Sequence, residues 1–307
     1  MSERAGILAA VVSSLVGGAT AGATRFVIGG IDPVTLAAFR FGIGFLCILP
    51  IALALRSRWP SGRDRLGVAG LGLMFFGGFF VLYNVSLGYT TAARGSLALS
   101  ILPLMTMVAG AALGVERLTG RKTLGVLIAI GGVAMALATG LAGAPEGAWR
   151  GDLIMIGGTV CMALYNVWSR PFIARSSPLG FLAAGMSVGA GCNVLLAGAT
   201  GGFAATGAFG WPHWAAVLYI GVCGGALAFY LWIYALERTT PTRVASTMTL
   251  NPVAAAIVAA VLVGEPLGFN LLFGIAGVCA GIWIASTAPR QVGVKPPIGS
   301  APRSGSP

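Results

Sequence analysis

Long uninterrupted apolar runs constrain the fold of this chain more than any other feature of the sequence. A helix needs about 20 apolar residues to cross a bilayer, and only helices and closed barrels satisfy their backbone hydrogen bonds there. The runs are continuous rather than alternating, which favours helices over barrel strands. We therefore expect an all-α membrane protein with ten transmembrane helices. The expected spans are 6–24, 34–55, 67–88, 92–115, 121–141, 151–169, 178–200, 213–235, 241–263 and 268–287.

The scarcity of charge supports a membrane location. Only 9% of the 307 residues are charged, and the mean hydropathy is +0.90. A soluble domain carries roughly 25% charged residues. The net charge of +11 is typical of nucleic-acid-binding proteins, but no basic patch here is interleaved with stacking aromatic residues. We expect the lipid bilayer as partner and no nucleic acid.

The distribution of Lys and Arg predicts the orientation. With the N-terminus inside, 15 of the 19 lie in cytoplasmic regions, against three in outer regions, Arg25, Arg94 and Arg150. Cytoplasmic loops are enriched in Lys and Arg. The expected location is the cytoplasmic (inner) membrane, with multiple passes and both termini in the cytoplasm.

An internal repeat divides the chain. A shift of 149 positions aligns the halves without a gap from about residue 72 to 136, and a shift of 145 aligns the earlier part. Matches of Arg, Pro and Glu carry weight because these residues are scarce in apolar runs. The matched pairs include Pro33 with Pro178, Arg94 with Arg243, Pro103 with Pro252, Glu116 with Glu265, and Gly132 with Gly281.

The repeat predicts the domain organisation. We expect a first five-helix repeat at 1–146, a second at 147–288 and a disordered cytoplasmic tail rich in Pro, Gly and Ser at 289–307. Because five is odd, the halves would be inverted relative to each other, as in many secondary transporters. A simple enlargement of a helical bundle by duplication is the alternative.

The repeat also bears on the N-terminal segment. Arg4 before an apolar run and Ala21-Gly22-Ala23 after it are typical of a cleaved signal peptide. The repeat aligns this segment with an interior one, so we expect it to be the first helix.

Three local patterns resemble a known family. Ala37-Ala38-Phe39-Arg40-Phe41 follows Pro33, Gly114-Val115-Glu116-Arg117-Leu118-Thr119 follows Pro103, and Gly264-Glu265-Pro266-Leu267 follows Pro252. With these, residues 5–288 resemble ten-helix, EamA-domain members of the drug/metabolite transporter superfamily. The first segment departs from the family, with Leu15-Val16-Gly17-Gly18 where a Trp is often found. The resemblance implies metabolite export or exchange across the cytoplasmic membrane.

Polar and aromatic side chains within the apolar spans are candidates for substrate binding, because such groups are costly in lipid and tend to face the interior. Hydroxyl groups that satisfy backbone freed by proline, and an aromatic belt at the interface, are the alternatives. The candidates are Arg40, Tyr83, Asn84, Ser96, Ser100, Tyr165, Asn166, Trp168, Tyr230 and Asn251.

Arg40 is the only charge well inside an expected span, and Gly185 aligns with it in the other half. We expect it to anchor an anionic group of the substrate or to pair with a carboxylate during opening. It lies about 9 Å into its helix, so extension of the guanidinium to the outer interface is the alternative.

Two matched prolines interrupt corresponding spans and indicate a possible binding site near the middle of the membrane. Pro103 and Pro252 each remove a backbone donor near the middle of corresponding spans, which predicts hinges or cavity lining, with a packing kink as the alternative. Glu116 and Glu265 also match, but they lie where helices meet turns, so capping or loop anchoring is expected rather than proton relay.

The cysteines, the histidine and the sequence motifs argue against a metalloprotein, a nucleotide-driven pump or an enzyme. The five cysteines lack metal-ligand spacing, His213 is the only histidine, and there is no phosphate-binding loop, so no metal, cofactor or enzymatic activity is expected. The predicted function is a secondary transporter that moves small organic metabolites, amino acids or similar amphipathic solutes, by alternating access around a central cavity. A passive channel or facilitator is the first alternative, and an intramembrane enzyme the second. GxxxG spacings indicate tight packing, with a monomer or homodimer expected.

Overall fold

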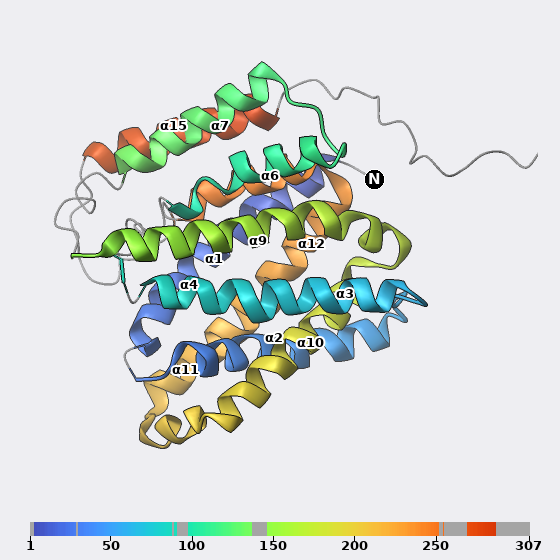
Figure 1. Ribbon diagram of the computed structural model, residues 1–307, viewed down its shortest axis with the longest axis vertical. Coiled ribbons are helices and arrows are strands. Elements are labelled where there is room, and N and C mark those ends of the chain that lie inside the picture. The colour runs from blue at the N-terminus through green and yellow to red at the C-terminus, as the bar shows by residue number, and fades with distance from the viewer. Residues whose placement is uncertain are drawn as a thin grey trace, which may run out of the picture.

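The described part of the protein is entirely helical (Figure 1). A computed structural model describes residues 3–28, 30–87, 89–90, 98–136, 146–251, 254 and 269–286. No strand occurs among these residues, which confirms the all-α expectation for them.

The first-half helices are α1 (Glu3–Ile28), α2 (Pro33–Ala54), α3 (Asp64–Gly72), α4 (Phe80–Leu87), α6 (Leu102–Ala112) and α7 (Gly120–Ala136). The second-half helices are α9 (Ala148–Arg175), α10 (Pro178–Ala199), α11 (Trp211–Tyr219), α12 (Ala228–Arg238), α13 (Pro241–Ser246) and α15 (Phe269–Ser286). Between them lie the 3-10 helices η2 (Gly202–Ala208) and η4 (Thr247–Thr249) and the π-helices η1 (Leu73–Phe79) and η3 (Ile220–Leu227).

Within the described ranges, five helical stretches are long and apolar enough to cross a membrane: Pro33–Ala54, Asp64–Ser86, Ala148–Arg175, Pro178–Ala199 and Trp211–Arg238. Parts of the expected spans 92–115, 121–141 and 241–263 lie outside the described residues. The count of ten spans therefore stays a prediction.

Repeat-related helices begin in the same way. Asp32 caps α2, its carboxylate accepting from the amides of Val34 and Thr35 at 3.0 Å, and Pro33 occupies the first helical position. Ser177 caps α10 by accepting from the Gly180 amide at 3.1 Å, and Pro178 follows it. Proline suits this position because its missing N–H would have no intrahelical partner.

Two long helices contain π-helical segments at related positions. The segment η1 joins α3 to α4, and η3 joins α11 to α12. A shift of 149 positions superimposes most of η1 on η3. Such insertions widen a helix and often accompany functional sites.

The main packing pairs cross between the halves. α2 packs against α10 and α7 against α15, each pair joining repeat-related helices, and Figure 1 shows α7 and α15 side by side. α2 also packs on η3 as α10 packs on η1, and α1 on α12 as α9 packs on α4. Exchanging the halves therefore leaves this set of contacts unchanged.

Small residues permit the closest of these crossings. A Cβ added at Gly72 would lie 2.1 Å from the carbonyl oxygen of Gly185, so no side chain fits there. Gly185, the residue that aligns with Arg40, lies at this crossing, and a Cβ added there would meet the Cα of Gly72 at 3.6 Å. A cluster of aromatic residues fills the adjacent core, with Phe75, Phe76 and Phe41 almost fully buried.

Two spans expected to be continuous are interrupted. Ser100 and Ile101 form a turn before α6, and the second-half counterpart changes from α13 to the 3-10 helix η4. Pro103 consequently lies in the first turn of α6 rather than within a bent helix. Glu265, Pro252 and the predicted tail at 289–307 lie outside the described residues.

Candidate functional site

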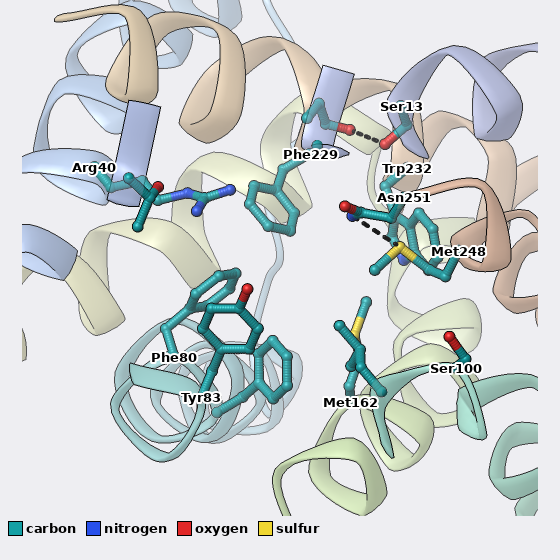
Figure 2. Close-up of a pocket in the computed structure, with 15 residues that line it drawn as sticks. Ser13, Arg40, Phe80, Tyr83, Ser100, Met162, Phe229, Trp232, Met248 and Asn251 are labelled. Carbon is teal, nitrogen blue, oxygen red and sulfur yellow. Dashed lines mark hydrogen bonds between the residues drawn. The ribbon is translucent and has the colours of Figure 1, made fainter. Parts of the chain in front are cut away.

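A cavity lies between helices of both halves (Figure 2). The volume open to water-sized molecules is about 100 Å³, room for several waters or part of a small organic solute. The lining residues come from α1, α2, η1, α4, the segment just before α6, α9, α12, η4 and the segment just after η4. They are Ser13, Gly17, Thr24, Arg40, Phe79, Phe80, Tyr83, Leu99, Ser100, Met162, Ala228, Phe229, Trp232, Met248 and Asn251.

The interrupted helices meet at this cavity. Leu99 and Ser100 line it just before α6, and Met248 and Asn251 line it from η4 and the residues after it. Leu99 and Met248 are equivalent under the shift of 149 positions. Broken helices at corresponding positions of two repeats commonly form the binding sites of transporters, because they free backbone groups near the midplane.

Arg40 extends from α2 into the cavity wall. Its Nε and Nη2 donate to the Gly224 carbonyl at 3.3 and 3.1 Å. Gly224 lies in η3, where the Ala228 amide donates to Cys223 rather than to Gly224 as it would in an α-helix. The guanidinium carbon lies 4.9 Å from the ring centre of Phe80, within the range of a cation–π contact. These contacts hold the Arg40 head group against η3 and α4.

Trp232 contributes an almost fully buried ring to the wall. Its Nε1 donates to Oδ1 of Asn166 on α9 at 2.9 Å, a bond between buried side chains. On the same side, Ser13 of α1 donates to the Ala228 carbonyl at 2.6 Å. The wall is thus tied together by hydrogen bonds between α1, α9 and α12.

Four of the predicted substrate-binding residues come together here: Arg40, Tyr83, Ser100 and Asn251. Arg40 comes from α2 and Tyr83 from α4, and Ser100 and Asn251 come from the two interrupted spans. In Figure 2, Arg40 lies on one side of Phe229 and Asn251 on the other.

The other predicted residues that the structure describes are not part of the cavity lining. Asn84 donates to the Pro33 carbonyl at 3.0 Å, and Asn166 holds Trp232. Tyr165 is buried and stacks on Phe75 with ring centres 4.2 Å apart. Trp168 is 43% exposed, and Tyr230 packs against Tyr234. Ser96 and Pro252 fall outside the described residues, so the binding and hinge assignments stay predictions.

Sequence reasoning missed most of the apolar lining, including Phe80, Phe229, Met162 and Met248. Such residues are common in every span, so nothing marks those that face a cavity. The one usable signal was spacing, since Tyr83 lies four residues after Phe79 and three after Phe80, on the same helical face.

Two contacts join the halves at opposite ends of the bundle. Glu3 of α1 accepts from Thr239 Oγ1 at 3.1 Å and pairs with Arg243. Asp152 of α9 accepts from Thr90 Oγ1 at 2.8 Å. Thr90 and Thr239 are equivalent in the repeat. The orientation predicted from the charge distribution would place the Glu3 contact on the cytoplasmic side and the Asp152 contact on the outer side.

Glu116 anchors another contact between the halves. Its Oε1 accepts from the Thr242 amide in the first turn of α13 at 3.0 Å, and its Oε2 pairs with Lys122 at 2.7 Å. Both side chains are buried. A carboxylate is stabilised at a helix N-terminus by the free amides there. The expected anchoring role of Glu116 is confirmed.

No group of three His, Cys, Asp or Glu side chains is arranged to hold a metal ion within the ranges that the structure describes. Cys47, Cys161, Cys192, Cys223 and Cys279 are free thiols.

Comparison with known proteins identifies the family. The model of the EamA-like transporter family matches residues 4–138 and again residues 149–287. The chain belongs to the EamA-like transporter family. This EamA-like protein is therefore a multi-pass membrane transporter, and several of its relatives are named as transporters or exporters.

The similarity to curated relatives spans most of each chain. The uncharacterized transporter YyaM of Bacillus subtilis is 25% identical over 277 residues, covering 89% of this chain and 90% of that protein. A probable terminal-alkyne amino-acid exporter of Streptantibioticus cattleyicolor is 29% identical over 244 residues, covering 76% and 80%. The aromatic amino acid exporter YddG of Ancylobacter novellus is 28% identical over 225 residues, covering 68% and 72%.

One solved crystal structure superposes with a TM-score of 0.76 at 23% identity, over 95% of this chain and 100% of the other. The likeness shows a shared fold.

Proposed function

We propose that this EamA-like protein exports or exchanges small amphipathic metabolites, amino acids or solutes like them, by alternating access. The observation that carries the proposal is the cavity at the meeting point of the interrupted helices, where Leu99 and Met248 stand in equivalent positions. A cavity shared by two repeats can open to one side or the other when the repeats exchange conformations.

The side chains that line the cavity support the proposal of a small amphipathic substrate. Aromatic rings and methionines make up much of the lining, while Ser13, Ser100 and Asn251 add hydroxyl and amide groups and Arg40 adds one charge. Sites for small molecules combine an apolar surface with a few polar groups in this way. Relatives named as exporters of amino acids agree with this class of substrate.

The proposal includes an inverted arrangement of the halves, 1–146 and 147–288, in the inner membrane with both termini in the cytoplasm. The exchange symmetry of the helix contacts supports it, as does the excess of Lys and Arg in the regions assigned to the cytoplasm. A monomer or a homodimer fits the proposal equally well.

Transport by purified protein in proteoliposomes is the test. Vesicles loaded with unlabelled leucine or phenylalanine are expected to accumulate the labelled solute faster than empty vesicles, with a rate that saturates. A channel would conduct without saturation and without this trans-stimulation, and that result would overturn the proposal.

The same vesicles test coupling to protons. No carboxylate among the described residues lines the cavity, so we expect facilitated exchange. An imposed pH gradient should leave the initial rate of exchange unchanged, whereas stimulation by the gradient would contradict this part of the proposal.

A further inference from the structure

Arg40 carries the only charge among the described residues that line the cavity. The ion pairs that the structure describes in the rest of the chain, such as Lys122 with Glu116 and Arg175 with Asp64, lie outside the cavity lining. None of the described carboxylates forms an ion pair with Arg40. A cation buried in a membrane protein is costly, and such residues commonly mark a substrate pathway.

The surroundings of Arg40 fix its head group without neutralising it. The Gly224 carbonyl accepts from Nε and Nη2, and the rings of Phe80, Phe41 and Phe229 lie 4.9, 5.7 and 5.9 Å from the guanidinium carbon. A guanidinium has five N–H donors in a planar fork. Two of them are directed at Gly224, which leaves the Nη1 donors and a second Nη2 donor for a ligand.

A planar fork of this kind matches a carboxylate, which accepts two parallel hydrogen bonds from adjacent nitrogen atoms. The guanidinium is also held in place before any ligand arrives, so little side-chain freedom is lost on binding. Figure 2 shows the Arg40 side chain extended toward Phe229, at the side of the cavity away from Asn251 and Met248.

The remainder of the wall discriminates between classes of solute. Asn251, Ser100 and Tyr83 supply neutral polar groups, and none of the described lining residues is an Asp or Glu. An organic cation would meet Arg40 with no opposing carboxylate. A monoanion would be neutralised by Arg40 while its apolar body contacts the rings and methionines.

We infer that Arg40 is the carboxylate-binding residue of the cavity, and that the protein selects solutes with a free carboxylate and an apolar body. The ammonium group of an amino acid is then dispensable for binding. This inference rests on the proposed function and names the chemical group by which its substrate is recognised.

Matched solutes test the inference on the unaltered protein. Leucine, isocaproate and leucinol share one apolar body, and phenylalanine, hydrocinnamate and phenylalaninol share another. Within each series the second member lacks the ammonium group and the third lacks the carboxylate. Binding of labelled isocaproate and hydrocinnamate to purified protein in detergent is measured, with the other members of each series as competitors.

In at least one series we expect the amino acid and the simple acid to compete at similar concentrations, and the amino alcohol to compete poorly. Competition by leucinol and phenylalaninol as strong as by the amino acids would overturn the inference. Absence of binding by both series at millimolar concentrations would do the same.

Substitution of the arginine gives a second, independent readout. Arg40→Gln should weaken binding of the acids by about tenfold to a hundredfold, the range of a lost charge-assisted hydrogen bond, and Arg40→Lys should recover part of the loss. Arg150→Gln removes an exposed arginine from α9 and serves as the matched control with unchanged binding. Unchanged affinity in a monodisperse, folded Arg40→Gln protein would contradict the assignment.

The two proposals fail in different ways. Carboxylate-dependent binding without saturable transport would remove the transport mechanism and leave the assignment of Arg40 intact. Saturable transport that is equally fast for solutes with and without the carboxylate would overturn the assignment of Arg40 and leave the transport mechanism intact.

Discussion

Trp232 is held in the cavity wall by Asn166, a side chain that does not itself line the cavity. The donor and the acceptor are buried, and they lie 66 positions apart in the sequence. A buried indole N–H that loses its acceptor costs free energy because no water replaces the bond.

Asn166→Leu is therefore expected to destabilise the protein by about 1–3 kcal/mol, the cost of leaving a buried donor unsatisfied. Adding Trp232→Phe removes the donor as well and should restore a large part of this loss. Unfolding of the two single variants and the double variant in detergent measures the coupling. A double variant no more stable than Asn166→Leu would show that the hydrogen bond does not contribute to the free energy of unfolding.

At the level of single residues, the sequence points to side chains that are rare in apolar spans. Arg40, Asn251 and Ser100 are predicted as binding residues on this ground, and all three line the cavity. Asn166 is predicted on the same ground, but its hydrogen-bond partner lies in another helix. No local sequence pattern identifies Trp232 as that partner. Phe80 and Met162 have no distinguishing feature at all, because packing and lining use the same residue types.

The contact between α7 and α15 depends on one face of α7. A Cβ added at Gly132 would lie 2.6 Å from the Val278 amide, whereas one added at the neighbouring Gly131 would have nothing within 4 Å. Tight contacts between small residues supply much of the packing energy of membrane helices, since lipid provides no hydrophobic drive between them.

Gly132→Ala should separate the two helices and cost about 1–3 kcal/mol, as other overpacked sites do. Gly131→Ala is the matched control on the same helix. It should be neutral or stabilising by up to about 1 kcal/mol, because alanine favours a helix more than glycine does. Thermal unfolding in detergent compares the pair, and equal stabilities would contradict the assigned crossing.

The continuous apolar runs located the elements, since each expected span overlaps at least one described helix. The matched prolines also predicted corresponding interruptions, although the break at Ser100 and Ile101 precedes Pro103 rather than bending the helix there. The π-helical segments η1 and η3 were not predicted, because the extra residue in a widened turn has no specific sequence signature.

The molecule as a whole is bridged between its halves at both ends. Glu3 with Thr239 joins them on the side assigned to the cytoplasm, and Asp152 with Thr90 joins them on the outer side. If the halves exchange conformations, each bridge should favour closure of its own side.

Neutral substitutions should therefore shift the population in opposite directions. Glu3→Gln is expected to increase labelling from the cytoplasmic side of a single cysteine at Ser13, and Asp152→Asn to increase it from the outside. A shift of severalfold corresponds to about 1 kcal/mol, well within the strength of one hydrogen bond to a charged group.

The labelling uses a protein whose five native cysteines have been replaced. Single cysteines at Ser61 and Ala205 establish which face is cytoplasmic and so check the proposed orientation. A shift in the same direction in both acid variants would contradict opposed closure of the two ends.

The partnership of α7 with α15 also imposes an order of assembly during synthesis. α7 is complete at Ala136, but the helix against which it packs most extensively begins at Phe269. In the interval the ribosome adds more than a hundred residues, while the small-residue face around Gly132 has no permanent neighbour. The first half thus remains incompletely packed in the membrane until α15 has been synthesised and inserted.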